Sequence, residues 1–184
     1  KNQADSRFGA AVDCAGDING DGYSDVIVGA YFYDNGQADE GAVFVYYGSA
    51  TGINSTAVAM LESNQASAVF GIALSAAGDV NGDGYSDILV GSFWYDNGQV
   101  DEGAAFVYHG GPDGLSAAQT RILSPVSQNQ AGIGNAVAGA GDVNGDGYSD
   151  VIIGAFNYDD GGGAGEGPRT RAPPDRRVQH RGHW

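Results

Sequence analysis

The nine residues Asp79–Asp87 read DVNGDGYSD, and this stretch decides how the rest of the chain is interpreted. The same nine residues return at Asp142–Asp150, and a copy with one substitution, DINGDGYSD, stands at Asp17–Asp25. The copies begin 62 and 63 residues apart, which places the chain among proteins built from internal repeats. We divide residues 1–167 into repeats that run approximately over 2–63, 64–128 and 129–167.

Each repeat carries short runs of β-branched and aromatic residues separated by Gly, Asn and Asp, as strands and turns require. In the first repeat these runs are 10–14, 26–30, 43–47 and a weaker one at 57–61. Four short strands in a repeat of about 60 residues are typical of β-propeller blades, whereas a β-solenoid usually has shorter repeats. The sequence therefore predicts an all-β fold of four-stranded antiparallel blades. About two and a half to three repeats are present, which makes an incomplete propeller.

The nine-residue stretch has oxygen-bearing side chains at its positions 1, 3, 5 and 9 and a glycine at position 6. This matches the first nine positions of a calcium loop, in which the backbone carbonyl of position 7 is a further ligand. Hard oxygen ligands without His or Cys favour Ca²⁺ over transition metals, and Mg²⁺ demands a tighter octahedron. Three near-identical copies make a metal-free turn the weaker interpretation. We predict about three structural Ca²⁺ sites, with ligands Asp17, Asn19, Asp21, Tyr23 and Asp25; Asp79, Asn81, Asp83, Tyr85 and Asp87; and Asp142, Asn144, Asp146, Tyr148 and Asp150.

Two other calcium-loop classes begin in a similar way. An EF-hand has a bidentate Glu at position 12, where this chain has Val28, Val90 and Ile153, and a strand-like run follows instead of a helix. Dockerin loops also need helices after the loop and a much shorter repeat interval. We therefore expect each ion in a loop between two strands, where it stabilises a turn of mutually repelling carboxylates.

Three short motifs recur together: Phe8-Gly9, the Asp-rich loop and Gly29-Ala30. Their combination resembles the FG-GAP repeats of the integrin α-chain head and of many bacterial secreted proteins. The resemblance covers residues 2–167 and implies a β-propeller, seven-bladed in integrins, with Ca²⁺ in the blade loops. The later copies are Phe70-Gly71 with Gly91-Ser92, and Gly134 with Gly154-Ala155. The chain departs from the family at the proline after Gly-Ala, which is replaced by Tyr31, Phe93 and Phe156, and at Ile133, which replaces the third Phe.

A further motif precedes each Phe-Gly pair. Asn2-Gln3-Ala4 returns as Asn64-Gln65-Ala66 and, at a distance from the glycine that is shorter by two residues, as Asn129-Gln130-Ala131. We interpret the third copy as a shortened version of the first two.

The 23 acidic residues outnumber the 8 basic ones, which gives a net charge of −15 and argues against nucleic-acid binding. The apolar runs are too short for a transmembrane helix. We expect no enzymatic activity, because every candidate catalytic residue has a structural explanation. His109 ends a strand, the serines Ser24, Ser86 and Ser149 lie inside the Asp-rich loops, and the acidic pairs at Glu40 and Glu102 repeat with the fold.

Two function classes remain open. The first is a calcium-binding adhesion or ligand-binding module, secreted or at the cell surface, with an unidentified protein or carbohydrate ligand. The second is a non-catalytic propeller piece of a larger secreted enzyme. Aromatic residues such as Tyr33 and Tyr95 are expected to pack in the core, with a ligand-binding rim as the alternative. Propellers use about four to eight blades, so we expect a ring of several copies or a fragment of a longer chain.

Two smaller features complete the sequence. Residues 168–184 form a basic tail rich in Pro and Arg, which we interpret as disordered or as out-of-frame translation. The single cysteine, Cys14, lies in an alternating stretch and is expected to be a small buried residue.

Overall fold

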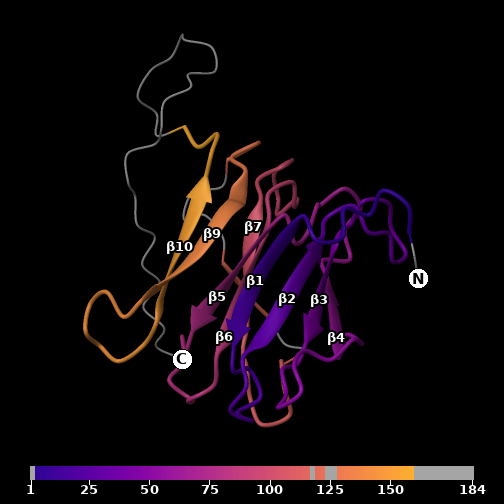
Figure 1. Ribbon diagram of the computed structural model, residues 1–184. Coiled ribbons are helices and arrows are strands. Elements are labelled where there is room, and N and C mark those ends of the chain that lie inside the picture. The colour runs from indigo at the N-terminus through magenta and orange to yellow at the C-terminus, as the bar shows by residue number, and fades with distance from the viewer. Residues whose placement is uncertain (1–2, 117–118, 123–127, 160–184) are drawn as a thin grey trace.

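The computed structural model describes residues 3–116, 119–122 and 128–159. All regular elements in these residues are β-strands (Figure 1). Nothing in the described ranges is a helix of the length and apolar character needed to cross a membrane. The basic tail and the end of the third repeat lie outside the described residues. The strands are β1 (Ala11–Gly16), β2 (Asp25–Ala30), β3 (Ala42–Tyr46), β4 (Ala59–Glu62), β5 (Ala73–Gly78), β6 (Asp87–Ser92), β7 (Ala104–Tyr108), β8 (Gln119–Ile122), β9 (Ile133–Gly141) and β10 (Asp150–Ala155).

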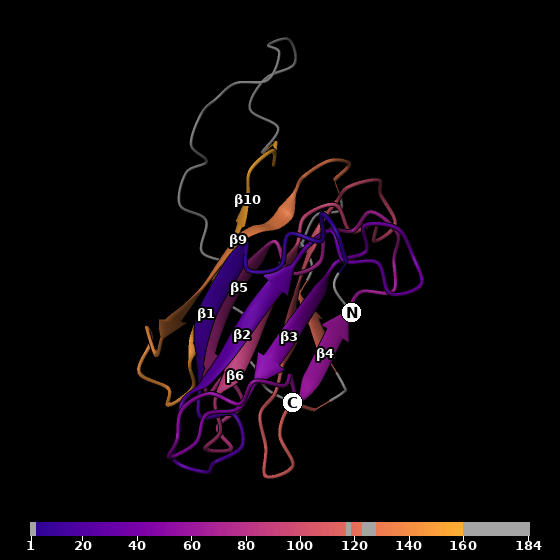
Figure 2. The same ribbon diagram turned by 45° about the vertical axis from the view of Figure 1, so that its right-hand side comes forward.

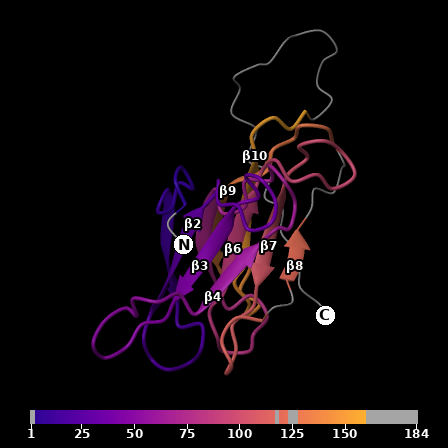
Figure 3. The ribbon, with the colours of Figure 1, turned by 90° about the vertical axis from the view of Figure 1, so that its right-hand side faces the viewer.

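Each of the first two repeats forms one four-stranded antiparallel sheet, in which neighbours in sequence are neighbours in space. The strand orders are β1-β2-β3-β4 and β5-β6-β7-β8, and Figure 3 shows the side on which β4 and β8 end these sheets. In the third repeat, β9 and β10 form a two-stranded sheet in the described residues. The short β-branched runs predicted from the sequence are therefore blade strands.

The sheets stack face to face, with β1 against β5 and β5 against β9 (Figures 1 and 2). Each repeat covers the next one through apolar side chains. Ile27, Val43 and Val45 of repeat 1 form one buried cluster with Phe70 and Phe106 of repeat 2. Leu89, Ala105 and Val107 of repeat 2 are packed by Val137, Val151 and Ile153 of repeat 3. The described sheets do not close into a ring, so the prediction of an all-β, incomplete propeller is confirmed.

The glycines of the two short motifs allow neighbouring repeats to approach closely. Within repeat 2, the Gly71 N–H donates to the Gly91 carbonyl (3.0 Å). The carbonyl of the same Gly71 faces Gly29 of repeat 1, where an added Cβ would clash with it. Gly91 meets the Gly134 carbonyl of repeat 3 in the same way. These motifs recur because backbone contacts both within and between repeats leave no room for a side chain.

The structure changes the alignment of the third repeat. Gln3 and Gln65 each use the side-chain amide to hold the backbone N–H of an aspartate 31 residues later, and Gln128 does the same with Asp159. Gln130 has a left-handed backbone (φ 57°) like that of Asp5 and Ser67, which are both at φ 60°. The third copy is therefore not shortened. The Asn129-Gln130-Ala131 match is displaced by two residues from the structural repeat.

Two expectations about side-chain packing have different outcomes. Tyr33 and Tyr95 pack edge-on against Phe44 and Phe106 (ring centroids 5.4 and 5.3 Å apart). Tyr95 is packed against the buried core cluster, as expected, whereas Tyr33 lies outside it on the half-buried Phe44. Cys14 is exposed, so its prediction as a buried residue is wrong. It lies on the face of β1 that points away from repeat 2, where no described repeat covers it.

Candidate metal-binding loops

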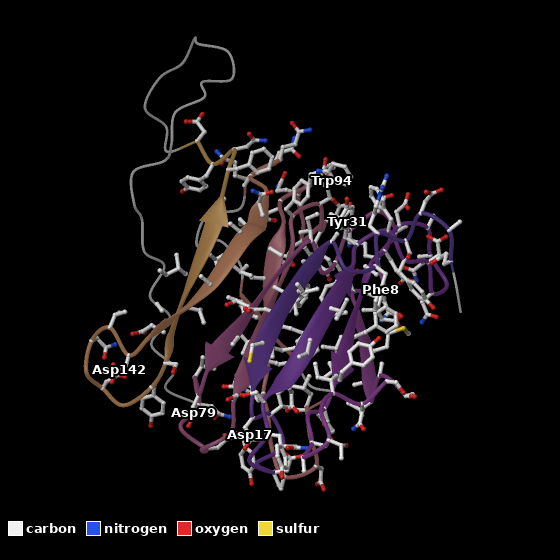
Figure 4. All side chains as sticks on the ribbon, in the orientation of Figure 1. Phe8, Asp17, Tyr31, Asp79, Trp94 and Asp142 are labelled. Carbon is white, nitrogen blue, oxygen red and sulfur yellow. The ribbon has the colours of Figure 1, made fainter. Side chains whose placement is uncertain are left out.

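The three Asp-rich loops connect β1 to β2, β5 to β6 and β9 to β10. Asp17, Asp79 and Asp142 begin these loops at the lower end of the sheets in Figure 4. Each loop follows an irregularity in strand pairing at a glycine with positive φ, namely Gly16 (71°), Gly78 (73°) and Gly141 (65°). A glycine bulge at the strand end therefore turns the chain into each loop.

The carboxylate at position 1 organises its own loop. Asp17 Oδ1 accepts the N–H groups of Gly20 (2.7 Å) and Asp21 (3.0 Å), and Asp17 Oδ2 accepts that of Gly22 (2.9 Å). Asp79 and Asp142 accept the same three N–H groups in their loops. Backbone N–H donors favour the charged form of a carboxyl, and they lower the pKa of Asp142 from its usual value.

Positions 3 and 5 are drawn toward position 1. The Asp21 N–H lies within hydrogen-bonding distance of both Asp17 Oδ1 (3.0 Å) and Asn19 Oδ1 (3.1 Å), so these two oxygens converge on one point. Asp21 Oδ1 accepts the Tyr23 N–H (3.0 Å). Loops 2 and 3 repeat all of these bonds. The position-3 amide also donates to Oδ2 at position 5, from Asn19 to Asp21 (3.1 Å) and from Asn81 to Asp83 (2.9 Å). In loops 1 and 2 the structure therefore brings together the side chains predicted at positions 1, 3 and 5.

The carboxylate at position 9 has a different environment. Asp25 is fully buried and joins the loop to the end of β3, because it accepts the N–H groups of Ile18 and Gly48 (both 2.9 Å). Asp87 is equally buried and accepts those of Val80 (2.8 Å) and Gly110 (2.9 Å). Burial is the main cause that raises the pKa of both carboxyls, and the charges of Asp17 and Asp21 raise that of Asp25 further.

The loops can be tested for their fit to a cation. Across the described ranges, no three His, Cys, Asp or Glu side chains form a ready-made metal-binding group. This agrees with position 9 facing backbone donors and with an amide rather than a carboxylate at position 3. The donors are all oxygens, however, and in loop 1 the charges of Asp17 and Asp21 lie close enough to Asp25 to raise the pKa of its carboxyl. The residues therefore fit a hard divalent cation in chemistry and charge.

The remaining candidates have structural positions. His109 directly follows β7, as expected of a residue at the end of a strand. Its Nδ1 lies 3.4 Å from Asp87 Oδ2. Glu40 and Glu102 are buried, and Glu40 Oε1 accepts the N–H groups of Asn35 and Gln37 in its own loop. This agrees with a loop-closing role for Glu40.

Sequence reasoning missed one set of residues at the loops. The Tyr-Ser pair at positions 7 and 8 of a loop contacts the loop of the preceding repeat: the Ser86 N–H donates to the Asp17 carbonyl (3.0 Å), and the Ser149 N–H to that of Asp79 (2.8 Å). The available signal was the invariant Gly at position 4 together with Tyr-Ser in all three copies. It pointed to a turn but not to a contact between repeats.

Two models of one repeat family match the sequence of this chain. The model of the FG-GAP repeat matches residues 8–46, and that of the FG-GAP-like repeat matches residues 79–153. Together they cover more than half of the chain, including all three Asp-rich loops.

Similar proteins include several integrin α-chains. Human integrin alpha-6 is 36% identical over 143 residues, which are 77% of this chain and 12% of the relative. Xenopus laevis integrin alpha-4 is 35% identical over 157 residues, and mouse integrin alpha-IIb is 33% identical over 160, each with 84% of this chain and 15% of the relative. The chain thus spans only about an eighth of the length of these curated relatives. It belongs to the FG-GAP repeat proteins and is integrin-α-like over most of its length.

Proposed function

We propose that this chain is a calcium-stabilised β-propeller module that binds an extracellular ligand and has no catalytic role. The observation that carries the proposal is the hydrogen-bond pattern shared by the three Asp-rich loops, in which position 1 accepts three backbone N–H groups and positions 3 and 5 lie beside it. A pattern kept in three copies supports one function for all three loops.

Calcium fits this function for an electrostatic reason. Each loop holds three aspartates within nine residues, and a divalent cation would change the local charge from −3 to −1. The proposed ligands are the side chains at positions 1, 3, 5 and 9 and the carbonyl at position 7. When bound, the ion would supply only structural charge neutralisation at the turn between two strands.

Thermal unfolding with and without calcium tests the proposal. Extracellular modules bind Ca²⁺ with dissociation constants of roughly 10⁻⁴–10⁻³ M. At a free concentration 100 times above the dissociation constant, each site would add about 2.7 kcal/mol to the free energy of unfolding. We expect a higher melting temperature in excess Ca²⁺ than in EDTA, and superimposable melts would overturn the proposal.

Single substitutions locate the sites. Asp21→Ala, Asp83→Ala and Asp146→Ala should each lower the calorimetric stoichiometry by one ion, because position 5 has no substitute ligand in its loop. Asp113→Ala is the matched control: it removes the same charge from an exposed residue outside the three loops. An equal change in Asp113→Ala would show that the variants report overall charge and not a site.

The proposed extracellular, ligand-binding role rests on the relatives and on the other end of the sheets. Integrin α-chains are cell-surface adhesion proteins, and this chain resembles part of them. Tyr31 and Trp94 lie at the end opposite the Asp-rich loops (Figure 4), and Trp94 is exposed. Phe93 contacts Phe156 of the next repeat (ring centroids 5.9 Å apart), so aromatic side chains continue across two repeats there. Trp94→Ala should weaken binding to extracellular proteins or glycans presented on an array without changing the melting temperature in Ca²⁺.

We also propose that the propeller is completed by further repeats, from copies of this chain or from a longer parent protein. Val12, Val28, Phe44 and Met60 are consecutive partners across the first sheet, and they form an apolar row. In repeat 2 the same positions include Val90 and Phe106, which repeat 1 buries. Val12 and Met60 are exposed, and apolar patches of this kind mark interaction surfaces.

Light scattering on the purified chain tests this part. We expect oligomers or aggregation at concentrations where a protein of 18.8 kDa without such a face stays monomeric. Val12→Lys places a charge at the β1 end of this apolar row and should shift the chain toward the monomer. A well-dispersed wild-type monomer with cooperative unfolding would contradict the proposal.

A further inference from the structure

We propose that the Tyr-Ser pair of each Asp-rich loop positions the cation site of the preceding repeat. Tyr85 and Ser86 would hold the loop Asp17–Asp25 in the shape that binds a divalent cation, and Tyr148 and Ser149 would do so for Asp79–Asp87. This inference rests on the proposed calcium binding, but it assigns part of each site to a different repeat.

The tyrosine ring closes over the glycine at position 4 of the preceding loop. A Cβ added to Gly20 would lie 2.7 Å from Cε1 of Tyr85, and one added to Gly82 would lie 2.6 Å from Cε1 of Tyr148. In both cases the nearest atoms are ring carbons and not the hydroxyl. The contact therefore depends on the flat ring, and it requires glycine at position 4.

The serine fixes the residue that organises the preceding loop. The Ser86 N–H donates to the carbonyl of Asp17, whose carboxylate accepts the N–H groups of Gly20, Asp21 and Gly22. The Ser86 side chain also packs on Gly16, the bulge residue directly before the loop, where a Cβ would clash with it. Two residues of repeat 2, Tyr85 and Ser86, thus contact loop 1 at Asp17 and Gly20 and at Gly16 directly before it.

Further contacts join the same segments. The Gly111 N–H donates to the carbonyl of Ile18 (2.9 Å), so the chain after β7 also binds loop 1. The loop's own N–H groups bind the position-1 carboxylate, and the next repeat binds the position-1 backbone carbonyl. A site in such a frame loses less conformational freedom when it binds a ligand.

Tyr23 provides the internal control. It occupies position 7 in loop 1, as Tyr85 does in loop 2, but in the described chain no Asp-rich loop precedes it. Tyr23 and Tyr85 contribute the same predicted backbone carbonyl to their own loops, and an alanine substitution leaves that carbonyl in place. The two substitutions therefore differ only in whether a preceding loop loses its cover.

The test is a Ca²⁺ titration followed by the amide signals of Gly22, Gly84 and Gly147, the position-6 glycines of the three loops, in ¹⁵N-labelled protein. Tyr85→Ala should weaken binding at the Gly22 loop by about five-fold or more, the lower range of coupling between sites, and leave the Gly84 loop unchanged. Tyr148→Ala should weaken the Gly84 loop in the same way. Tyr85→Phe should retain wild-type binding, and Tyr23→Ala should weaken neither loop 2 nor loop 3.

A calcium-free measurement separates this inference from the proposed function. In EDTA, Tyr85→Ala should accelerate hydrogen exchange of the Gly22 amide, which donates to Asp17, and Tyr23→Ala should leave the Gly84 amide unchanged. If Ca²⁺ moves no loop signal in the wild type, calcium binding fails, but the exchange result still decides whether Tyr85 positions the loop. Unchanged Gly22 exchange and unchanged affinity in Tyr85→Ala would overturn the inference, as would weakening confined to the Gly84 loop.

Discussion

Phe8 and Phe70 occupy the same position in two repeats, yet Phe8 is 56% exposed and Phe70 is completely buried. Their local structures are the same. Each follows a residue with positive φ, Arg7 at 58° and Val69 at 51°. Each ring meets the phenylalanine of its own third strand, at 5.5 Å for Phe8 and 5.4 Å for Phe70, with an interplanar angle of 63° in both.

The difference between the two phenylalanines comes from the neighbouring repeat. Repeat 1 places Val43 and Val45 in the cluster that contains Phe70, whereas no described repeat lies in front of Phe8. The same contrast appears at the opposite end, where Ile27 and Leu89 are buried and their counterpart Ile152 is 48% exposed. The repeat sequence thus determines the local conformation, and the neighbouring repeat determines whether the side chain is buried.

The first prediction uses this contrast directly. Phe70→Ala should lower the free energy of unfolding by about 3 to 5 kcal/mol, the usual loss when a buried phenylalanine is truncated. Phe8→Ala should lower it by about 1 kcal/mol or less, because only an exposed aromatic pair is lost. Urea unfolding at low protein concentration in Ca²⁺ measures both values.

The result for Phe8 also reports on the propeller in solution. If Phe8→Ala destabilises the chain as strongly as Phe70→Ala, and the loss grows with protein concentration, a second copy covers repeat 1. An equal loss that does not depend on concentration would contradict the contrast drawn here.

The second prediction moves the contrast to a glycine. Gly91→Ala should destabilise the protein by about 1 to 3 kcal/mol, because the new Cβ would press on the Gly134 carbonyl of the next repeat. Gly154 is the equivalent residue of repeat 3, and a Cβ there would make ordinary contacts at 3.5 Å with Ala136. Gly154→Ala should therefore be neutral or stabilise the protein by up to about 1 kcal/mol, since alanine lowers the conformational entropy of the unfolded chain. Thermal melts of the pair decide it, and equal losses in both variants would refute the role of the neighbour.

Much of the blade could be predicted from the sequence, because its signals are local. A run of β-branched and aromatic residues predicted a strand at 43–47, and the strand is Ala42–Tyr46. The Asp-rich loops were predicted between strands, and they lie there. Within the loops, the convergence of positions 1, 3 and 5 follows from carboxylates and N–H groups only a few residues apart.

The features that could not be predicted depend on contacts between residues far apart in the sequence. Cys14 follows the same alternation as a buried residue, but its face of β1 has no described neighbour. The buried Asp25 carboxylate accepts the N–H of Gly48, which follows another strand, and the Tyr85 ring covers a glycine in another repeat. In the third repeat, the identical residues Asn129-Gln130-Ala131 suggested the wrong alignment. The hydrogen bonds show that Gln128 is the equivalent of Gln3 and Gln65.

The third prediction tests that equivalence. Gln128 binds Asp159 through two hydrogen bonds, from the Asp159 N–H to Oε1 (2.8 Å) and from Nε2 to the Asp159 carbonyl (3.0 Å). Gln128→Ala should cost about 1 kcal/mol, a typical value for the loss of such bonds. Gln130→Ala should change stability by less than about 0.5 kcal/mol, because it alters an exposed side chain away from these bonds. A larger loss of stability in Gln130→Ala than in Gln128→Ala would support the alignment based on residue identity instead.

The fourth prediction compares, in EDTA, position 9 of loop 2 (Asp87) with position 1 of loop 3 (Asp142). It should be the smallest effect because Asn keeps the shape of Asp. Burial raises the pKa of Asp87 in the folded protein, so its contribution to stability is greatest below its unfolded pKa and declines as the pH rises through the folded one. Backbone N–H groups lower the pKa of Asp142, so its contribution is present above its unfolded pKa and is lost as the pH falls through the folded one.

Substitution by Asn removes each dependence and should give opposite trends. Relative to the wild type, Asp87→Asn should become more stable as the pH rises from 3 to 6, and Asp142→Asn should become less stable over the same range. Urea unfolding at several pH values measures both differences. Asp87 faces His109, whose positive charge opposes the effect of burial, so Asp87→Asn is also compared in a His109→Tyr background, which reproduces the Tyr47 of repeat 1. If Asp87 and Asp142 showed the same trend there, the buried end of the loop would not differ electrostatically from the exposed end. The distinction between a position that depends on its own loop and one that depends on contacts outside the loop would then not hold for the loops.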